Sequence, residues 1–399
     1  MTELSVYGTG ETSYVLPDYE RILPWKLHPR FEDMKRETRG WIRQFPEVHE
    51  WIPEYRNGSE TPSLDQWLEE GGGDTFACLM APTIRSDRIL ALCQFDVWWT
   101  YLDDSVSVGK DGRFYRIGHD ARRAAMERVI EILESPGTPY DPDGPPPDLI
   151  DRVCGARLLA DVWYRIAPAL PAPLLTRFIQ DTAACVRLWP TEPELSAEGT
   201  TLDFEPFMAV RRRTIAVMTL NRHLEFGLGI DLTDEIATYP ELTRLQELQV
   251  DYLILLNDLY SFRKEYLRSR DTSNLIAVLC IRHHHSLQQA VDTICARMTA
   301  TEKTFIAERD TFLSDHPGIR PEVREFLDGL GYVMSGTLHY HRTTSRYHGL
   351  HHDGHEITSG RITLTRNGTV LTTDTTPGHD QGRIDFAEHS LPGVNQGDL

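Results

Sequence analysis

Apolar side chains recur at intervals of three and four residues along most of the chain before residue 350. This spacing is typical of amphipathic helices, because about 3.6 residues complete one helical turn. It predicts helices over 31–45, 85–102, 117–134, 150–166, 171–189, 204–228, 241–268, 286–312 and 321–347. Stretches rich in glycine and proline, such as 71–73, 109–112 and 143–147, separate them. Strands do not alternate with helices in this part, so a parallel sheet is not expected.

From residue 350 onward the pattern changes to one rich in Gly, Thr, His and Asp. Residues 361–373 alternate around Asn367-Gly368, which is a strong hairpin signal. We therefore predict an N-terminal segment over 1–20, one all-α domain over 21–349 and a polar, mobile tail over 350–399 that contains the hairpin signal. The all-α domain would be a bundle of about ten helices.

Composition narrows the classes of function. Asp and Glu total 60 against 41 Lys and Arg, for a formal net charge of -19. Such a balance argues against a nucleic-acid binder and against docking on anionic membranes. No apolar run approaches the ~20 residues that span a bilayer, and the polar, acidic N-terminus does not resemble a signal peptide. A cytoplasmic protein with six scattered, free cysteines is expected.

The strongest candidate for chemistry is the stretch Asn-Asp-Leu-Tyr-Ser-Phe-Arg-Lys-Glu at 257–265. Asn257, Ser261 and Glu265 follow one another at spacing four, so on a helix they lie along one face. An amide, a hydroxyl and a carboxylate oxygen on one face suit Mg²⁺, which keeps waters and binds phosphate oxygens. The alternative is a polar network that binds no ligand. From these three residues alone, the two interpretations are about equally supported.

A second candidate is Asp103-Asp104, at the end of a predicted helix. Paired carboxylates are a plausible magnesium site, although most such pairs are helix caps or solvated loops. Phe95 and Trp99 precede Asp103 by two turns and one turn, so aromatic rings lead up to the carboxylate on one face. Such rings are usually core, but ring faces also stabilise cations.

Arginines supply a third candidate. Arg211-Arg212-Arg213 lies in an otherwise apolar helical stretch, where an arginine on the inner face needs an anionic partner such as phosphate. Arg346-Tyr347 closes the last predicted helix and carries no information alone. The histidines at 283–285 are expected to form a solvated helix cap. Those at 348, 351, 352 and 355 could bind a metal, but in a mobile tail they are not expected to. The glycines at 71–73 do not match a phosphate-binding loop.

In their joint order and spacing, these motifs resemble the class I terpene synthases of microbial type, over most of residues 20–350. The stretch 257–265 fits the family's N-D-x-x-S-x-x-x-E motif, and Asp103-Asp104 stands where its aspartate-rich motif stands. Arg211 lies 46 residues before Asn257, as the family's diphosphate-sensing arginine does, and Thr214 and Ile215 follow at its linker and effector positions. The pair at 346–347 matches its R-Y pair, while Pro24, His28-Pro29 and Trp41 echo its N-terminal pattern.

The resemblance implies a single-domain helical bundle around a central cavity, in which a linear isoprenyl diphosphate is ionised and its carbocation cyclised. It implies three Mg²⁺ ions, two on Asp103 and one on Asn257, Ser261 and Glu265. Arg211, Lys264, Arg346 and Tyr347 would bind the diphosphate. Candidate wall residues of the pocket are Phe95, Trp99, Phe207 and Tyr340.

The chain departs from the family at one point, because Asp103-Asp104 is followed by Ser-Val-Ser-Val without a third acid. Farnesyl diphosphate is the expected substrate and a sesquiterpene the expected product. A diterpene cyclase acting on geranylgeranyl diphosphate, a chain-elongating prenyltransferase and a non-catalytic binder of prenyl diphosphates remain alternatives. The elongase would need a second aspartate-rich motif in place of 257–265. A homodimer is left open.

Overall fold

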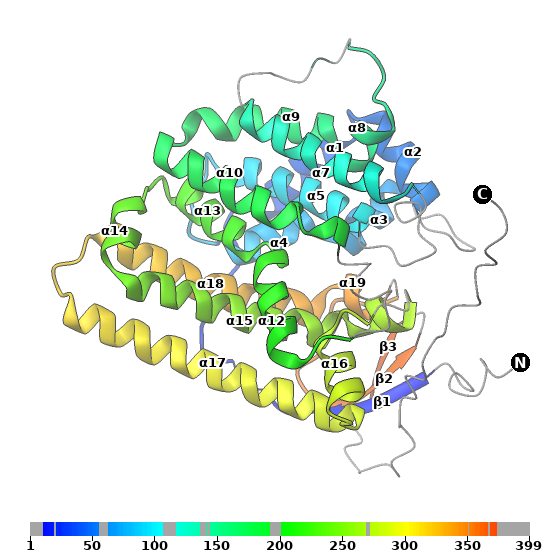
Figure 1. Ribbon diagram of the computed structural model, residues 1–399, viewed down its shortest axis with the longest axis vertical. Coiled ribbons are helices and arrows are strands. Elements are labelled where there is room, and N and C mark those ends of the chain that lie inside the picture. The colour runs from blue at the N-terminus through cyan, green and yellow to red at the C-terminus, as the bar shows by residue number, and fades with distance from the viewer. Residues whose placement is uncertain are drawn as a thin grey trace, which may run out of the picture.

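The computed structural model describes residues 11–19, 21–55, 63–106, 117–135, 141, 144–191, 201–268, 272–349, 351–365 and 368–372. These residues form a helical bundle with one small sheet at its edge (Figure 1). The α-helices are α1 Phe31–Ile42, α2 Pro46–Tyr55, α3 Leu64–Gly71, α4 Gly73–Met80, α5 Ile89–Val106, α7 His119–Glu134, α8 Leu149–Cys154, α9 Ala156–Ile166, α10 Ala172–Val186, α12 Phe204–Thr214, α13 Val217–Leu228, α14 Thr233–Thr238, α15 Pro240–Phe262, α16 Leu275–Arg282, α17 Leu287–Asp315, α18 Pro321–Thr343 and α19 Ser345–His348. Two short 3₁₀ turns, η1 Ala167–Ala169 and η2 Trp189–Thr191, and a π-helical turn, η3 Arg263–Arg268, complete the helical part.

The all-α fold predicted from the apolar spacing is confirmed. Each predicted helical range contains observed helix, and the short helices α2, α3, α4, α14 and α16 are additions that a long-window pattern misses. The predicted helix over 204–228 is in fact two helices, α12 and α13, with a break at Ala216, whose φ is 63°. That left-handed conformation is unusual for a residue with a Cβ and interrupts the helical ladder.

Close packing brings the central helices together. α18 lies against α4, α13 and α15, and α5 lies against α1, α4 and α9. At Gly336 on α18, an added Cβ would lie only 2.2 Å from the carbonyl oxygen of Leu79 on α4. Only glycine allows α18 to approach α4 so closely, and this approach fixes the helix that leads into Arg346 and Tyr347.

A three-stranded antiparallel sheet joins the two ends of the described chain. β1 (Glu11–Leu16) pairs with β2 (Gly360–Thr365), and β2 pairs with β3 (Thr369–Thr372). The expected hairpin is therefore present, although Arg366 and Asn367 in its turn lie outside the described residues. β1 contacts α17 and β2 contacts η3, so the sheet lies beside the turn that carries Lys264 and Glu265 (Figure 1).

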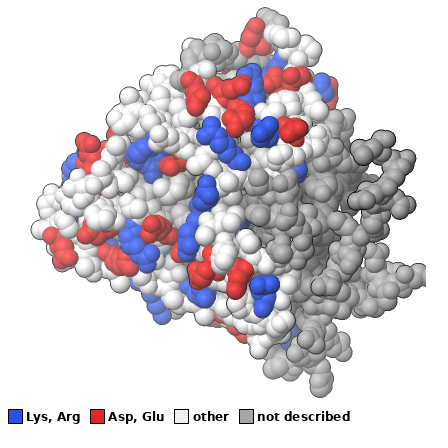
Figure 2. All heavy atoms as spheres, viewed as in Figure 1, with Lys and Arg blue, Asp and Glu red and all other residues white. Residues whose placement is uncertain are grey.

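No helix among the described residues is both long and apolar enough to cross a bilayer. Cys78, Cys93, Cys154, Cys185 and Cys295 are buried and Cys280 is half-buried, all as free thiols. On the face drawn in Figure 2, Lys and Arg side chains lie among Asp and Glu side chains rather than in a field of their own. Arg212 and Asp251 form one such ion pair, at 2.6 Å.

Candidate active site

The end of α5 presents two carboxylates to a cluster of cations. Arg346 of α19 lies 2.7 Å from Asp103 and 2.8 Å from Asp104 through the same Nη2 atom. The Lys264 ammonium lies 3.7 Å from Asp103 and 3.4 Å from Asp104. Asp104 is buried and also accepts a hydrogen bond of 2.9 Å from the indole of Trp67, whereas Asp103 is partly exposed. Asp103 is thus the carboxylate that is more accessible to a ligand.

The electrostatic surroundings of Arg346 stabilise its charged form. Burial alone would lower the pKa of Arg346, but the carboxylates of Asp104 and Asp103 outweigh burial and hold that pKa well above its ordinary value. Arg346 is therefore a permanent cation beside the carboxylates. A buried cation of this kind can form charge-assisted hydrogen bonds to an anionic ligand.

The second cluster lies at the end of α15 and in η3. Asn274, which caps α16, donates hydrogen bonds of 2.8 Å to Glu265 and 3.4 Å to Ser261. One amide group thus contacts both side chains, so they lie on the same side of the helix. Because η3 is a π-helical turn, Glu265 is set on a wider turn than the α-helical spacing predicts.

Arg211 contacts the start of this cluster. Its Nη2 atom lies 3.1 Å from the side-chain oxygen of Asn257 and 3.1 Å from Asp258. Asp258 is fully buried and also accepts a hydrogen bond of 2.8 Å from the backbone N–H of Leu275. The neighbouring Arg212 instead pairs with Asp251 at the surface. Arg211 is thus the member of the arginine run that faces the interior.

Asn257 connects the two clusters. Its amide nitrogen donates a hydrogen bond of 3.1 Å to the Tyr347 hydroxyl and lies 3.3 Å from His341 Nε2. The rings of His341 and Tyr347 are stacked with centroids 4.6 Å apart. Because Tyr347 follows Arg346 directly, a continuous set of contacts leads from Asp103 through Arg346 and Tyr347 to Asn257 and Arg211.

The break between α12 and α13 lies where the family's linker and effector residues are expected. The carbonyl oxygen of Thr214 accepts hydrogen bonds from Trp189 Nε1 at 2.9 Å and from Cys185 Sγ at 3.3 Å. Ile215 follows, half-buried, and Ala216 takes the left-handed conformation. The structure therefore places Thr214 and Ile215 at the end of the helix that carries Arg211.

Three of the four candidate wall residues, Phe95, Trp99 and Tyr340, lie beside other aromatic rings. Phe95 and Trp99 lie with ring centroids 6.1 Å apart, and Trp99 also meets Trp189 at 5.2 Å. Trp99 is half-buried, whereas Phe95, Phe207 and Tyr340 are buried. Tyr340 donates a hydrogen bond of 2.5 Å to the carbonyl of Gly71. Burial raises its pKa to about 12, so its phenol stays neutral.

Several residues of the site escaped the sequence analysis. Trp67, Asn274, Asp258 and His341 each hold a predicted site residue in place. Asn274 carried a usable signal, since an asparagine directly before an apolar helix is a common N-cap. Asp258 belongs to the motif at 257–265 but received no role of its own. Trp67 and His341 act through contacts between distant segments, for which a single sequence carries no local pattern.

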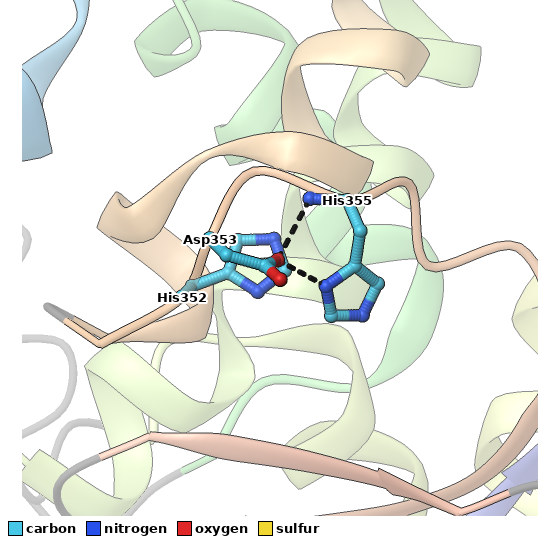
Figure 3. Close-up of side chains that lie close together, drawn as sticks. All are labelled: His352, Asp353 and His355. Atoms are coloured by element: carbon cyan, nitrogen blue, oxygen red, sulfur yellow. Dashed lines mark hydrogen bonds and ion pairs between the residues drawn. The ribbon is translucent and has the colours of Figure 1, made fainter.

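The histidines after α19 form a separate cluster. Figure 3 shows Asp353 lying between His352 and His355, whose possible ligand atoms all lie within 4.8 Å of one another. Asp353 already accepts hydrogen bonds from the ring and from the backbone N–H of His355. Asp353 and His355 are exposed. The hydrogen bonds within this exposed loop account for the cluster, and it lies outside the contacts that link Asp103 to Arg211.

Comparison with known proteins identifies the class of protein. The sequence model of terpene synthase family 2, C-terminal metal binding, matches residues 94–304. The chain is 27% identical over 331 residues to microbial terpene synthase-like protein 13 of Selaginella moellendorffii, covering 82% of this chain and 84% of the relative. It is 29% identical over 361 residues to sesquiterpene synthase Agr3 of Cyclocybe aegerita, covering 89% and 94%.

Solved structures show the same fold. The linalool/nerolidol synthase of Streptomyces clavuligerus, solved in complex with 2-fluorogeranyl diphosphate, aligns with a TM-score of 0.64 at 17% identity. The alignment covers 83% of this chain and 100% of that chain. Fold, site and comparisons together define a class I terpene synthase.

The chain belongs to terpene synthase family 2, whose model matches more than half of its 399 residues. It is therefore a terpene synthase, and the matched region is the family's metal-binding part, so a divalent metal ion is its cofactor.

Proposed function

We propose that the protein is a Mg²⁺-dependent cyclase that ionises farnesyl diphosphate, releases diphosphate and converts the carbocation to a sesquiterpene. The observation that carries the proposal is the set of contacts from Asp103 through Arg346, Tyr347 and Asn257 to Arg211. These contacts join segments that lie far apart in the sequence. They bring two helices with oxygen-bearing side chains together with cations that suit a diphosphate.

The residues present fit magnesium. Asp103 on one side and Asn257, Ser261 and Glu265 on the other offer oxygen atoms only, which is the ligand chemistry that Mg²⁺ prefers. The mutual contacts of Ser261 and Glu265 with Asn274 keep these two donors together. Three bound Mg²⁺ ions would neutralise charge on the leaving diphosphate.

The protein's own cations recognise the diphosphate. Arg211, Lys264 and Arg346 would donate charge-assisted hydrogen bonds to its oxygens, and the Tyr347 hydroxyl a neutral one. Arg346 and Lys264 already lie beside Asp103 and Asp104, so this local cluster is roughly balanced although the chain carries a net charge of -19. The local cations let an anionic substrate approach an acidic protein.

The prenyl chain needs apolar surroundings, because water would trap a carbocation. Phe95, Trp99, Phe207 and Tyr340 would supply walls whose ring faces stabilise positive charge. Phe95 and Trp99 share α5 with Asp103, and Phe207 shares α12 with Arg211. Tyr340 lies near the end of α18, shortly before α19, which carries Arg346 and Tyr347. This arrangement would place the prenyl chain against these aromatic rings while its diphosphate lies at the polar site.

Incubation of purified protein with farnesyl diphosphate and Mg²⁺, followed by gas chromatography and mass spectrometry, tests the proposal. A cyclic sesquiterpene hydrocarbon or alcohol with release of diphosphate is the expected result. Turnover of geranylgeranyl diphosphate instead would indicate a diterpene cyclase, and a longer prenyl diphosphate an elongase. Unchanged substrate in every case would indicate a binder. Curated relatives named as sesquiterpene synthases support the C15 substrate.

A further inference from the structure

A carboxyl group and an imidazole meet in the interior of the bundle, away from the polar site. Asp96 on α5 and His223 on α13 are 4% and 1% exposed, and Asp96 Oδ1 lies 3.5 Å from His223 Nδ1. Among the described residues, neither ring nitrogen of His223 has a hydrogen-bond partner, and neither does Asp96 Oδ2. Buried polar atoms are normally hydrogen-bonded, so unpartnered atoms on two facing residues call for an explanation.

The position of Asp96 relative to Asp103 suggests why these polar atoms have no partner. The two residues are seven apart on α5, so they project within about 20° of the same direction and lie about 10 Å apart along the axis. Trp99, which lies between them in the sequence, contacts Phe95 and Trp189 and stays half-buried. If Asp103 faces the diphosphate, Asp96 faces the region two turns deeper, which the prenyl chain would occupy.

His223 reaches the same region from the opposite helix. It lies on α13, beyond the break that follows Arg211 and Ile215. Its ring meets Phe95 at 4.7 Å and Phe178 at 5.4 Å between centroids. The imidazole is thus enclosed by aromatic rings, which suit a hydrocarbon and not a metal ion or a phosphate.

Both groups are neutral in these surroundings. Burial raises the pKa of Asp96 well above its usual value and lowers the pKa of His223 to about 3. At neutral pH the pair consists of an un-ionised acid and a free base. An acid and a base with unused polar atoms can give and take protons where no water is available.

We propose that Asp96 and His223 form a proton relay for hydrocarbon intermediates within the cyclisation, an inference that rests on the proposed function. His223 accepts a proton from a carbon beside the cationic centre, and the electron pair of the broken C–H bond becomes a C=C bond. Asp96 then donates its carboxyl proton to another C=C bond of the resulting neutral olefin, which creates a second carbocation. The imidazolium returns its proton to the Asp96 carboxylate, so the pair ends as it began.

Turnover of farnesyl diphosphate in D₂O tests the relay. Between turnovers the Asp96 proton exchanges with solvent, so the wild-type product is expected to carry one deuterium on carbon. Asp96→Asn keeps the shape and removes the acid. This variant should release a different, undeuterated olefin, with deuterium incorporation reduced by about 100-fold, while diphosphate release persists.

Two further variants complete the test. His223→Phe should also abolish incorporation of deuterium. Thr219→Val, one turn earlier on α13, removes a buried hydroxyl that pairs with Thr182 and should leave incorporation unchanged. A wild-type product without solvent deuterium, or unchanged incorporation in Asp96→Asn, would overturn the relay even if diphosphate is released normally. Failure of the wild type to release diphosphate would instead overturn the proposed function.

Discussion

Arg346 lies 2.7 Å from Asp103, so a residue at the end of the helical domain contacts a carboxylate 243 positions earlier in the chain. The guanidinium neutralises the carboxylates of Asp103 and Asp104 at the end of α5 and remains a cation in its buried position. One side chain therefore connects the aspartate-rich segment to the R-Y pair.

Replacement of this guanidinium should impair catalysis strongly. Arg346→Lys keeps the charge but loses the planar fork of donors, so kcat/KM with farnesyl diphosphate should fall by about 100-fold. Arg212→Lys is the matched control, because Arg212 pairs with Asp251 at the surface. Its effect should stay within about threefold. An equal loss of kcat/KM in both variants would show that the loss does not depend on the position of Arg346 beside Asp103.

Folding stability should depend on Glu302, which holds the N-terminal segment. This buried carboxylate on α17 accepts hydrogen bonds from the Tyr19 hydroxyl at 2.6 Å and from the backbone N–H of Leu23 at 3.1 Å. Glu302→Gln should lower the free energy of unfolding by about 1–3 kcal/mol, measured by urea denaturation. Glu308→Gln, on the exposed side of the same helix, should change it by less than about 1 kcal/mol. A smaller effect at Glu302 would contradict this role.

Acid should destabilise the fold through buried histidines. Burial lowers the pKa of His348 to about 3, whereas an unfolded histidine titrates near 6.5. The unfolded state therefore binds more protons below pH ~6.5, and the stability that His348 contributes is lost as pH falls from there toward 3. Compared with His348→Gln, the wild type should lose about 2 kcal/mol between pH 7 and pH 5.

Equilibrium unfolding at both pH values measures this difference. The exposed His119→Gln variant should follow the wild type at both. Parallel pH dependence of the wild type and His348→Gln would show that His348 does not carry the effect.

The segment after residue 349 should matter to stability as well. Glu356 pairs with Arg342 at 3.3 Å and with Arg21, and β2 pairs with β1. A chain that ends at residue 349 loses all of these contacts, so its free energy of unfolding should fall by at least about 2 kcal/mol in urea denaturation. Glu356→Gln in the full chain separates the ion pairs from the strands. An unchanged stability of the shortened chain would support a domain that is complete at 349.

Local patterns predicted the helices and the row of polar side chains at 257–265, because a row at spacing four depends on nothing distant in the chain. The position of Arg211 and the R-Y pair could be assigned only through resemblance to a family. The partners themselves could not be predicted: Asp258 holds Arg211 across 47 positions, and Tyr347 meets Asn257 across 90. Such contacts depend on how helices pack, which a single sequence does not encode locally.

The sheet was only half predicted for a similar reason. The hairpin of β2 and β3 has a local signal at Asn367-Gly368, but β1 pairs Glu11 with Thr365, at the other end of the chain. The segment at 11–16 is too short to be recognised as a strand without its partner. Ser107 and Val108, which stand where the family has its third acid, lie outside the described residues.

The central claim is that oxygens from α5 and from the end of α15 hold metal ions that drive loss of diphosphate. The most direct test is diphosphate release from farnesyl diphosphate as a function of Mg²⁺ concentration, for the wild type, Asp103→Ala and Asn257→Ala. We predict saturable, Mg²⁺-dependent release by the wild type and release reduced by more than about 100-fold in both variants, with unchanged helicity. Wild-type release without a divalent metal, or normal release by both variants, would contradict the claim.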